Sequence, residues 1–189
     1  QMCIRDSSIA IPKIESADEC RTFLKDLGTN ILILPQIETP LGIATIESWD
    51  CSNIEFSGIG FGSADYCAST GGDMGKASLA YGRGKIINAA ALYNTLALDG
   101  VWLDFRDPDG CREETLYVKT MGFKGRFAIH PDQIKPIHDA YRPTTEELEW
   151  AKGVLEEAKT AGSGAFKYQG KMVDAPVLAV ARLIMSRED

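Results

Sequence analysis

The chain has 189 residues, a net charge of −7, and 44% hydrophobic and 25% charged residues, which suits a globular domain with its own core. The acidic balance argues against nucleic acid or anionic membranes as partners, since both favour a basic surface. No run approaches the roughly 18 apolar residues of a membrane span. No segment has the charged-then-apolar form of a signal peptide.

The five cysteines are too widely spaced to predict a zinc site or a redox pair. We therefore expect free thiols in a reducing compartment, the cytoplasm or the mitochondrial matrix. Residues 1–7 (QMCIRDS) lack an initial Met and run directly into an apolar stretch. We interpret them as a junction from cloning or sequence assembly, with a short native tail as the alternative.

Short apolar runs alternate with helical stretches along most of the chain. The first run, residues 8–14, is a strand candidate, and a capping box beginning at Ser16 predicts a helix over 16–27. The second run, 31–37, is almost continuously apolar, as expected for a strand buried on both faces. Within it, Pro35 predicts a strand end or a bulge.

The remaining elements continue this alternation, and Asp109 is the predicted cap of one of the later helices. Strands are predicted at 54–61, 100–105 and 126–129, and helices at 41–48, 76–94, 109–121 and 131–141. Five strands joined without hairpin signals predict a parallel α/β sheet, either doubly wound or closed into a barrel. No G-x-G-x-x-G motif opens a helix after the first strand, which disfavours a dinucleotide-binding fold.

The pattern changes after residue 141. A helix is predicted at 144–161, with Thr144 and Glu147 as its capping box, and a Gly/Ser link follows at 162–164. A hairpin-like segment at 166–172 and a last helix at 175–187 complete the chain. We therefore predict two parts, an α/β part over residues 8–141 and an appended helical segment over residues 142–189.

Polar residues follow four of the predicted strands, at Glu38, Asp65, residues 104–107 and His130. Sites in parallel sheets gather at the carboxyl ends of the strands. Glu38 and Asp65 are 27 positions apart, about one strand–helix unit, so we expect both carboxylates on one face of the fold. Two carboxylates with water and a bidentate oxygen ligand suit an octahedral Mg²⁺ site.

Each of these residues also has a purely structural interpretation. A carboxylate at a strand end is often a helix cap or a solvated loop residue. His130 is typical of a hydrogen-bonded residue ahead of a helix, and Arg106 and Asp107 predict a loop salt bridge. Asp174 precedes Ala-Pro, which by itself favours a helix N-cap.

Taken together, six segments of the chain resemble the citrate lyase β-subunit/malyl-CoA lyase family of the aldolase–citrate lyase superfamily. They are IPKIES (11–16), QIETP (36–40), GFGSAD (60–65), DGVWLD (99–104), GRFAIHP (125–131) and MVDAP (172–176). Each is weak alone, but the six occur in the family's order and spacing. The resemblance extends from about residue 8 to the end.

The resemblance implies a (β/α)8 barrel of which this chain carries about strands 4 to 8, with a C-terminal helical lid over 142–189. It implies that Glu38 and Asp65 bind Mg²⁺. The family's G-A-E-D motif is G-S-A-D here, which keeps the ligand and replaces the preceding Glu. Asp174 of the lid would act in a neighbouring subunit's site, in a homo-oligomer such as a trimer or hexamer. The residues expected near substrate or CoA are Gly62, Ser63, Ala64, His130 and Pro131.

The implied function is a Mg²⁺-dependent carbon–carbon lyase acting on malyl-CoA, citramalyl-CoA or a citryl thioester, carried by CoA or by an acyl-carrier protein. The products would be an acetyl thioester and a 2-oxo acid, with Asp174 as general acid/base. Alternatives on the same scaffold are a malyl-CoA thioesterase, a malate-synthase-like condensing enzyme, and an aldolase for free 2-oxo acids. A non-catalytic paralogue or regulatory subunit is a further alternative.

The family's carboxylate-binding arginine lies in the part of the barrel before this segment. A substrate would therefore lack its main anchor in the chain as it stands, and a partial barrel leaves sheet edges unpaired. We expect this chain by itself to be inactive and prone to aggregation.

Overall fold

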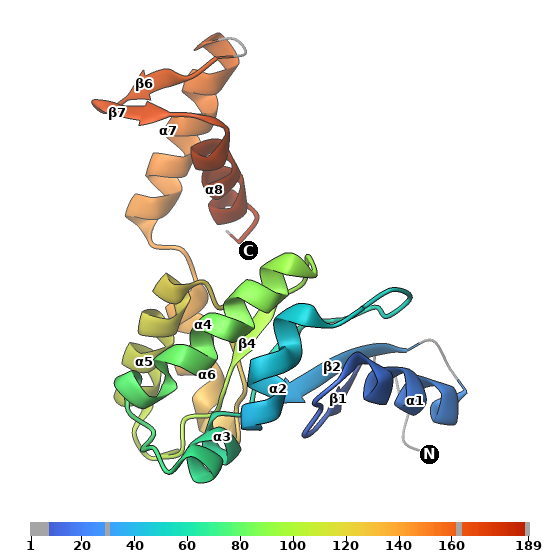
Figure 1. Ribbon diagram of the computed structural model, residues 1–189. Helices are drawn as coiled ribbons and strands as arrows, with labels where there is room; N and C mark the ends of the chain where they lie inside the picture. Colours follow the sequence, from blue (N-terminus) through green and yellow to red (C-terminus); the bar gives the residue numbers. More distant parts are fainter. Residues whose placement is uncertain (1–7, 29–30, 162–163, 188–189) are drawn as a thin grey trace, which may run out of the picture. The chain divides into compact units, whose positions relative to one another are not determined.

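A computed structural model describes residues 8–28, 31–161 and 164–187 (Figure 1). The predicted junction at residues 1–7 lies outside the described residues, as does most of the Gly/Ser link. The chain divides into two compact units, Gln1–Tyr141 and Arg142–Asp189.

The first unit is built on one parallel sheet of five strands. The strands are β1 (Ser8–Ile11), β2 (Leu32–Ile37), β3 (Ile59–Phe61), β4 (Ala97–Asp99) and β5 (Gly125–Arg126). They lie in chain order, each pairing in parallel with the next, so every connection is a crossover that carries at least one helix. The predicted parallel α/β sheet is therefore confirmed. Apolar strand residues fill its core, and Ile33, Ile37, Ile59 and Phe61 have no exposed surface.

Helices and two short 3-10 turns connect the strands or follow the last of them (Figure 1). They are α1 (Ala17–Leu27), α2 (Pro40–Thr45), η1 (Ile46–Ser48), α3 (Ser63–Thr70), α4 (Lys76–Leu92), α5 (Pro108–Met121), η2 (Pro131–Gln133) and α6 (Ile134–Tyr141). The predicted N-cap of α1 is present, because Ser16 Oγ accepts from the Glu19 amide at 3.3 Å. Gly28 ends the helix with a φ of 63°. Helix α3 was not among the predicted helices.

The predicted strand at 100–105 is wrong. The fourth strand lies earlier, and its pairing with β3 covers Ala97 and Leu98. Gly100 packs so closely on Ser63 that any side chain there would overlap the serine hydroxyl, and the chain leaves the sheet at this point. Leu103 is 54% exposed and lies in the loop that follows. The position of this strand was not predicted because the strand ends on a charged residue, Asp99.

Two further local predictions need correction. The N-cap of α5 is Asp107, whose Oδ1 accepts from the Gly110 amide at 2.9 Å, while Asp109 lies in the first turn. Asp107 therefore caps α5 and does not form the predicted salt bridge with Arg106. Strand β2 continues through Pro35, which is the last residue paired with β1, so its missing N–H does not interrupt the strand.

The second unit is a helix, a hairpin and a helix. It contains α7 (Thr145–Ala161), β6 (Phe166–Tyr168), β7 (Lys171–Val173) and α8 (Ala175–Met185). The predicted capping box is confirmed, because the Thr144 amide donates to Glu147 at 2.8 Å and the Glu147 amide donates to Thr144 at 3.1 Å. Ala151, Val154 and Ala181 are at the centre of its small core.

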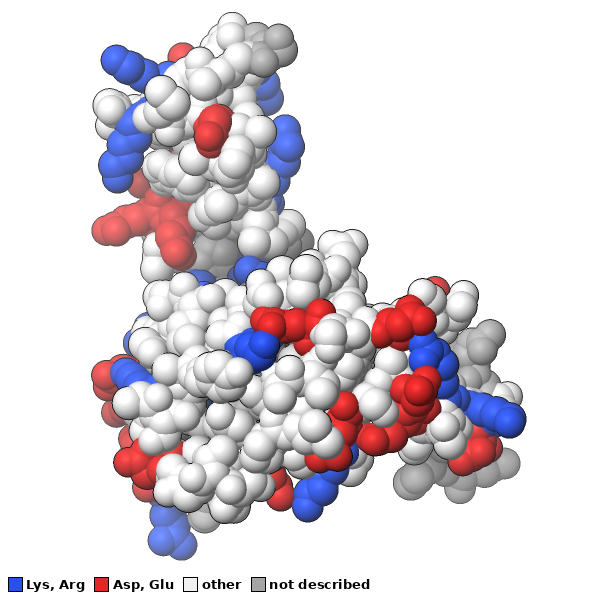
Figure 2. Space-filling view, viewed as in Figure 1, with Lys and Arg blue, Asp and Glu red and all other residues white. Residues whose placement is uncertain are grey.

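The surface of the first unit is mixed in charge. Figure 2 shows basic and acidic side chains interspersed over it in this view. Across the described residues, none of the helices has both the length and the apolar character that crossing a bilayer requires.

Candidate active site

Glu38 is held at the carboxyl edge of the sheet by the elements on either side of it. Strand β2 ends at Ile37, and Thr39 caps α2 by accepting from the Gly42 amide at 3.0 Å. The Glu38 side chain between them is only 7% exposed. A buried carboxylate needs partners, and these come from the neighbouring strands.

Gly62 brings the end of β3 against Glu38. Its amide donates to the Ile37 carbonyl at 3.0 Å, and a Cβ at this position would overlap the Glu38 carboxylate. Helix α3 then begins with Ser63, which is buried, and places Asp65 in its first turn. The glycine is therefore required by the close approach of Glu38, and not by an unusual backbone angle.

Lys13 links the two carboxylates from the end of β1. Its amide donates to Glu38 Oε1 at 2.9 Å, and its ammonium lies 3.4 Å from Asp65 Oδ1. The Lys13 backbone has a φ of 54°, a left-handed conformation that is uncommon outside glycine. The structure thus brings Glu38 and Asp65 together through Lys13. Sequence reasoning missed this residue as part of the site, although it lies in the IPKIES segment after the first strand.

The electrostatics of this cluster favour a cation. Burial raises the pKa of the Glu38 carboxyl, the Lys13 amide and ammonium oppose that rise, and the nearby Asp65 charge adds to it. Two close carboxylates, one of them buried, are stabilised by any positive charge between them. In this structure the Lys13 ammonium supplies part of that charge.

The donor set fits Mg²⁺. Among the described residues, no group of three or more His, Cys, Asp or Glu side chains gathers as a metal site. The protein would therefore supply two carboxylates, and water and substrate oxygens would complete the coordination. Mg²⁺ is commonly held in this way, whereas structural zinc needs four protein ligands.

His130 and Pro131 follow β5. His130 Nδ1 accepts from the Asp132 amide at 3.2 Å, so the residue caps η2, which begins at Pro131. Its ring also stacks on Phe105, with centroids 4.8 Å apart and an interplanar angle of 29°. The Phe105 ring has the Arg106 guanidinium 5.3 Å from its centroid. The structural interpretation of His130 holds, and the stack adds a partly exposed aromatic surface.

Asp174 belongs to the second unit. Its Oδ1 accepts from the Val177 amide at 3.3 Å, and the predicted N-cap of α8 is confirmed. The residue is exposed, so its carboxylate is available to other groups. Ala64 lies in the first turn of α3 beside Asp65, half-buried, where the family's motif carries a Glu.

Comparison with known protein families shows which family the chain belongs to. Residues 5–131 match the HpcH/HpaI aldolase/citrate lyase family, and residues 84–189 match the C–C bond lyases of the TIM-barrel fold. The chain belongs to the HpcH/HpaI aldolase/citrate lyase family.

Curated relatives of this family member match nearly all of it. The mitochondrial citramalyl-CoA lyase of Mus musculus is 29% identical over 208 residues, covering 98% of this chain and 62% of that protein. The citrate lyase subunit beta-like protein of Deinococcus radiodurans is 32% identical, covering 96% of this chain and 66% of that protein. The chain thus spans about two-thirds or less of the length of these relatives.

Solved structures agree with the barrel interpretation. Protein CitE of Mycobacterium tuberculosis, in complex with magnesium, acetoacetate and coenzyme A, matches with a TM-score of 0.80 and 30% identity, over 97% of this chain and 69% of CitE. The citrate lyase beta subunit of the same organism, with oxaloacetate and magnesium, matches with a TM-score of 0.60 and 28% identity, over 72% of this chain and 62% of that one. The five-stranded sheet is therefore part of a TIM-barrel type of fold.

Proposed function

We propose that the protein is a Mg²⁺-dependent carbon–carbon lyase that splits a 3-hydroxyacyl thioester into an acetyl thioester and a 2-oxo acid. The observation that carries the proposal is the pairing of Glu38 and Asp65 at the carboxyl edge of the sheet. The names of the relatives support the thioester class, as do the magnesium and coenzyme A held by the CitE structure.

Glu38 and Asp65 would hold the metal. When bound, Mg²⁺ supplies Lewis-acid polarisation and a template for the oxygens of the 2-oxo acid part of the substrate. The Lys13 amide keeps Glu38 oriented. Gly62, at the end of β3, leaves the space that the Glu38 carboxylate occupies.

The other residues act on the thioester part. Cleavage turns the substrate hydroxyl into the carbonyl of the 2-oxo acid, so the hydroxyl proton must leave to a base. The electron pair of the broken carbon–carbon bond passes to the acetyl fragment, whose carbon must then take up a proton. Asp174 from the 142–189 segment of a neighbouring copy would supply that proton as general acid. This role requires a homo-oligomer, a trimer or hexamer, with the segment as a lid. His130 and Pro131 would lie along the CoA arm, beside the Phe105 ring.

The test is acetyl-CoA release from malyl-CoA and from citramalyl-CoA, with and without Mg²⁺, by the protein expressed from its full reading frame. We expect metal-dependent release, and we expect Asp65→Asn to abolish it, because the change removes a charged ligand. Asp109→Asn is the matched control, since Asp109 also lies in the first turn of a helix and is exposed. It should keep full activity.

Full metal-dependent activity in Asp65→Asn would contradict the metal assignment. A folded, Mg²⁺-binding protein that releases no acetyl-CoA would favour a carrier-protein thioester as substrate, or a non-catalytic paralogue. Hydrolysis of malyl-CoA to malate would identify a thioesterase. The compartment proposed for this reaction is a reducing one, and the four described cysteines are free thiols.

A further inference from the structure

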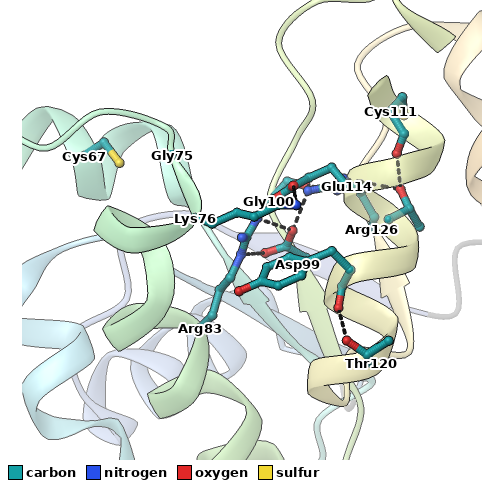
Figure 3. A network of polar contacts seen from close by, with 12 residues as sticks. Cys67, Gly75, Lys76, Arg83, Asp99, Gly100, Cys111, Glu114, Thr120 and Arg126 are labelled. Carbon is teal, nitrogen blue, oxygen red and sulfur yellow. Dashed lines mark hydrogen bonds and ion pairs between the residues drawn. The ribbon is translucent and has the colours of Figure 1, made fainter. Parts of the chain in front are cut away.

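A charge-balanced ionic network lies between α4, α5 and the ends of β4 and β5. Figure 3 shows Asp99 between Arg83 and Arg126. Arg83 Nε and Nη2 donate to the two Asp99 oxygens at 3.1 Å each, and Arg126 Nη2 donates to Asp99 Oδ2 at 2.6 Å. Arg83 Nη2 also lies 2.8 Å from Glu114 Oε1. Two buried arginines thus face two carboxylates, so the network needs no further charge.

The network lies on the helix side of the sheet, whereas Glu38 lies on the other side. Phe61 of β3 faces α4, since its ring fills the space that a side chain on Gly82 would need. The strand register places Asp99 level with Phe61, and Glu38 one position beyond it. Side chains alternate between the two faces of a strand, so Asp99 faces the helices and Glu38 faces away from them. A site built on this network is therefore separate from the candidate metal site.

Two buried donors beside this network have no acceptor. Among the described residues, Arg83 Nη1 and Trp102 Nε1 are the buried side-chain nitrogens or oxygens without a hydrogen-bond partner. Such groups are rare in folded proteins, because an unpaired buried donor destabilises the fold. Trp102 is held in place, since its carbonyl accepts from Gln133 at 2.7 Å and its ring packs on Gly110. The two donors therefore require an acceptor that the described residues do not supply.

Arg83 and Trp102 line one cavity of about 280 Å³. Met74, Leu79 and Leu103 supply much of an otherwise apolar wall. Ligand pockets usually measure about 300–1,000 Å³, so this cavity suits a molecule of only a few heavy atoms. Water would pair with the two donors but would leave the apolar side chains hydrated, whereas an apolar group would cover them. The wall therefore favours a ligand that combines an acceptor with an apolar body.

The charges at the lining disfavour an ionic ligand. Glu114 and Asp104 both line the cavity, and the Lys76 ammonium, half exposed, lies 3.6 Å from Glu114 Oε2. An anion would meet these two carboxylates without a buried cation left to pair with it. A cation would approach the Arg83 guanidinium and would leave the Arg83 and Trp102 donors without an acceptor. An uncharged molecule with an acceptor oxygen avoids both costs.

We propose that this cavity binds a small uncharged carbonyl compound, an amide or a ketone, with a short apolar body. Its carbonyl oxygen has two lone pairs and accepts from the two unpaired donors, Arg83 Nη1 and Trp102 Nε1. Its apolar body covers Met74, Leu79 and Leu103. The site goes beyond the proposed lyase activity and does not depend on it.

The test is a titration of the protein, expressed from its full reading frame, with butyramide, butyrate and butylamine at neutral pH, followed by the NMR signals of the tryptophan indole N–H groups. We expect butyramide to shift the Trp102 signal saturably. The Trp49 signal should stay fixed, because its Nε1 already donates to Thr45 at 3.1 Å. Butyrate and butylammonium carry opposite charges on chains of similar length. Each should bind at least about tenfold more weakly, because an ion without a buried partner is costly to desolvate.

Two variants separate the site from general effects. Trp102→Phe removes one of the two donors, identifies the Trp102 signal by its absence, and should weaken butyramide binding about tenfold, measured by calorimetry. Leu103→Ala trims the exposed part of the apolar wall and should weaken binding about fivefold. Leu96→Ala is its matched control, at 50% exposure against 54%, and should bind butyramide normally.

Three results would each overturn the proposal. The first is the absence of a saturable shift, which would mean that water satisfies both donors. The second is binding of either ion as tightly as butyramide. The third is unchanged butyramide binding in Trp102→Phe.

Discussion

Lys13 pairs an unfavourable backbone conformation with a central position in the candidate site. A left-handed φ costs an L-residue with a side chain about 1–2 kcal/mol, and Lys13 adopts a φ of 54°. The conformation directs its amide to Glu38 while its ammonium reaches Asp65. The strain is therefore retained where it organises two carboxylates, as is common at functional sites.

Replacing Lys13 by Met tests the charge balance of the site. The ammonium competes with any cation for Asp65, so Lys13→Met should tighten Mg²⁺ binding by up to about fivefold, the range for an exposed ion pair. The backbone amide that holds Glu38 is unchanged. Calorimetric titration at low ionic strength measures the effect, and Lys13→Arg, which keeps the charge, serves as control. Weaker Mg²⁺ binding in Lys13→Met would mean that the ammonium positions Asp65 instead of competing with the metal.

At the scale of elements, Tyr93 joins the end of α4 to the turn that follows α2. Its hydroxyl donates to the Ile46 carbonyl at 2.6 Å and accepts from the Trp49 amide at 3.0 Å. Tyr93→Phe leaves both backbone groups unpaired, so we expect a loss of about 1–3 kcal/mol in the free energy of unfolding at pH 8. Urea denaturation measures it. Tyr81→Phe, at an exposed tyrosine of α4, should change little.

The ionisation of Tyr93 should also contribute to unfolding at alkaline pH. Burial raises the pKa of Tyr93 from 10.0 to about 12, so the folded state favours the neutral phenol. This contribution to stability is complete below pH 10 and is lost as the pH rises towards 12. Tyr93→Phe should therefore lose less stability than the parent between pH 9 and 11. Equal losses in both proteins would show that Tyr93 does not titrate in this range.

Asp99, at the end of β4, accepts hydrogen bonds from the buried side chains of Arg83 and Arg126. We expect these ion pairs to dominate the stability of this edge of the sheet. Asp99→Asn removes the charge that both buried arginines share, and breaking a buried ion pair in this way costs about 3–5 kcal/mol. Urea denaturation measures the loss. Asp18→Asn makes the same change in an exposed pair with Arg21 and should have little effect. A small effect of Asp99→Asn would indicate that water molecules solvate the two arginines after the carboxylate charge is removed.

These elements also show what could be predicted from the sequence. Glu38 and Asp65 were identifiable because each follows an apolar run at about one strand–helix spacing. Strand β4 was misplaced because Asp99 reads as a loop residue until its arginine partners, distant in sequence, are known. Lys13 was missed because its role depends on a backbone conformation that no residue pattern specifies. Local periodicity thus predicted the sheet, whereas buried charge pairs required the tertiary structure.

At the scale of the whole molecule, the proposed metal ligands and the proposed proton donor lie in different units. Glu38 and Asp65 belong to the unit Gln1–Tyr141, and Asp174 belongs to the unit Arg142–Asp189. A catalytic role for Asp174 therefore requires the second unit to act as a lid on a barrel, which we propose is that of a neighbouring copy. Asp174 also caps α8, so simple removal of the residue would confuse a folding defect with a loss of catalysis.

Asp174→Asn separates the two roles. Asparagine caps a helix about as well as aspartate, so the second unit should melt as in the parent, with the indole N–H NMR signal of Trp150 as its reporter. Asparagine cannot transfer the proton, so metal-dependent acetyl-CoA release should fall by about 10²–10⁴-fold, the usual contribution of a general acid. Asp174→Ala should lose the cap as well and lower the melting temperature of this unit. Full turnover in Asp174→Asn would leave Asp174 with the capping role alone, and the proton would have to come from another group.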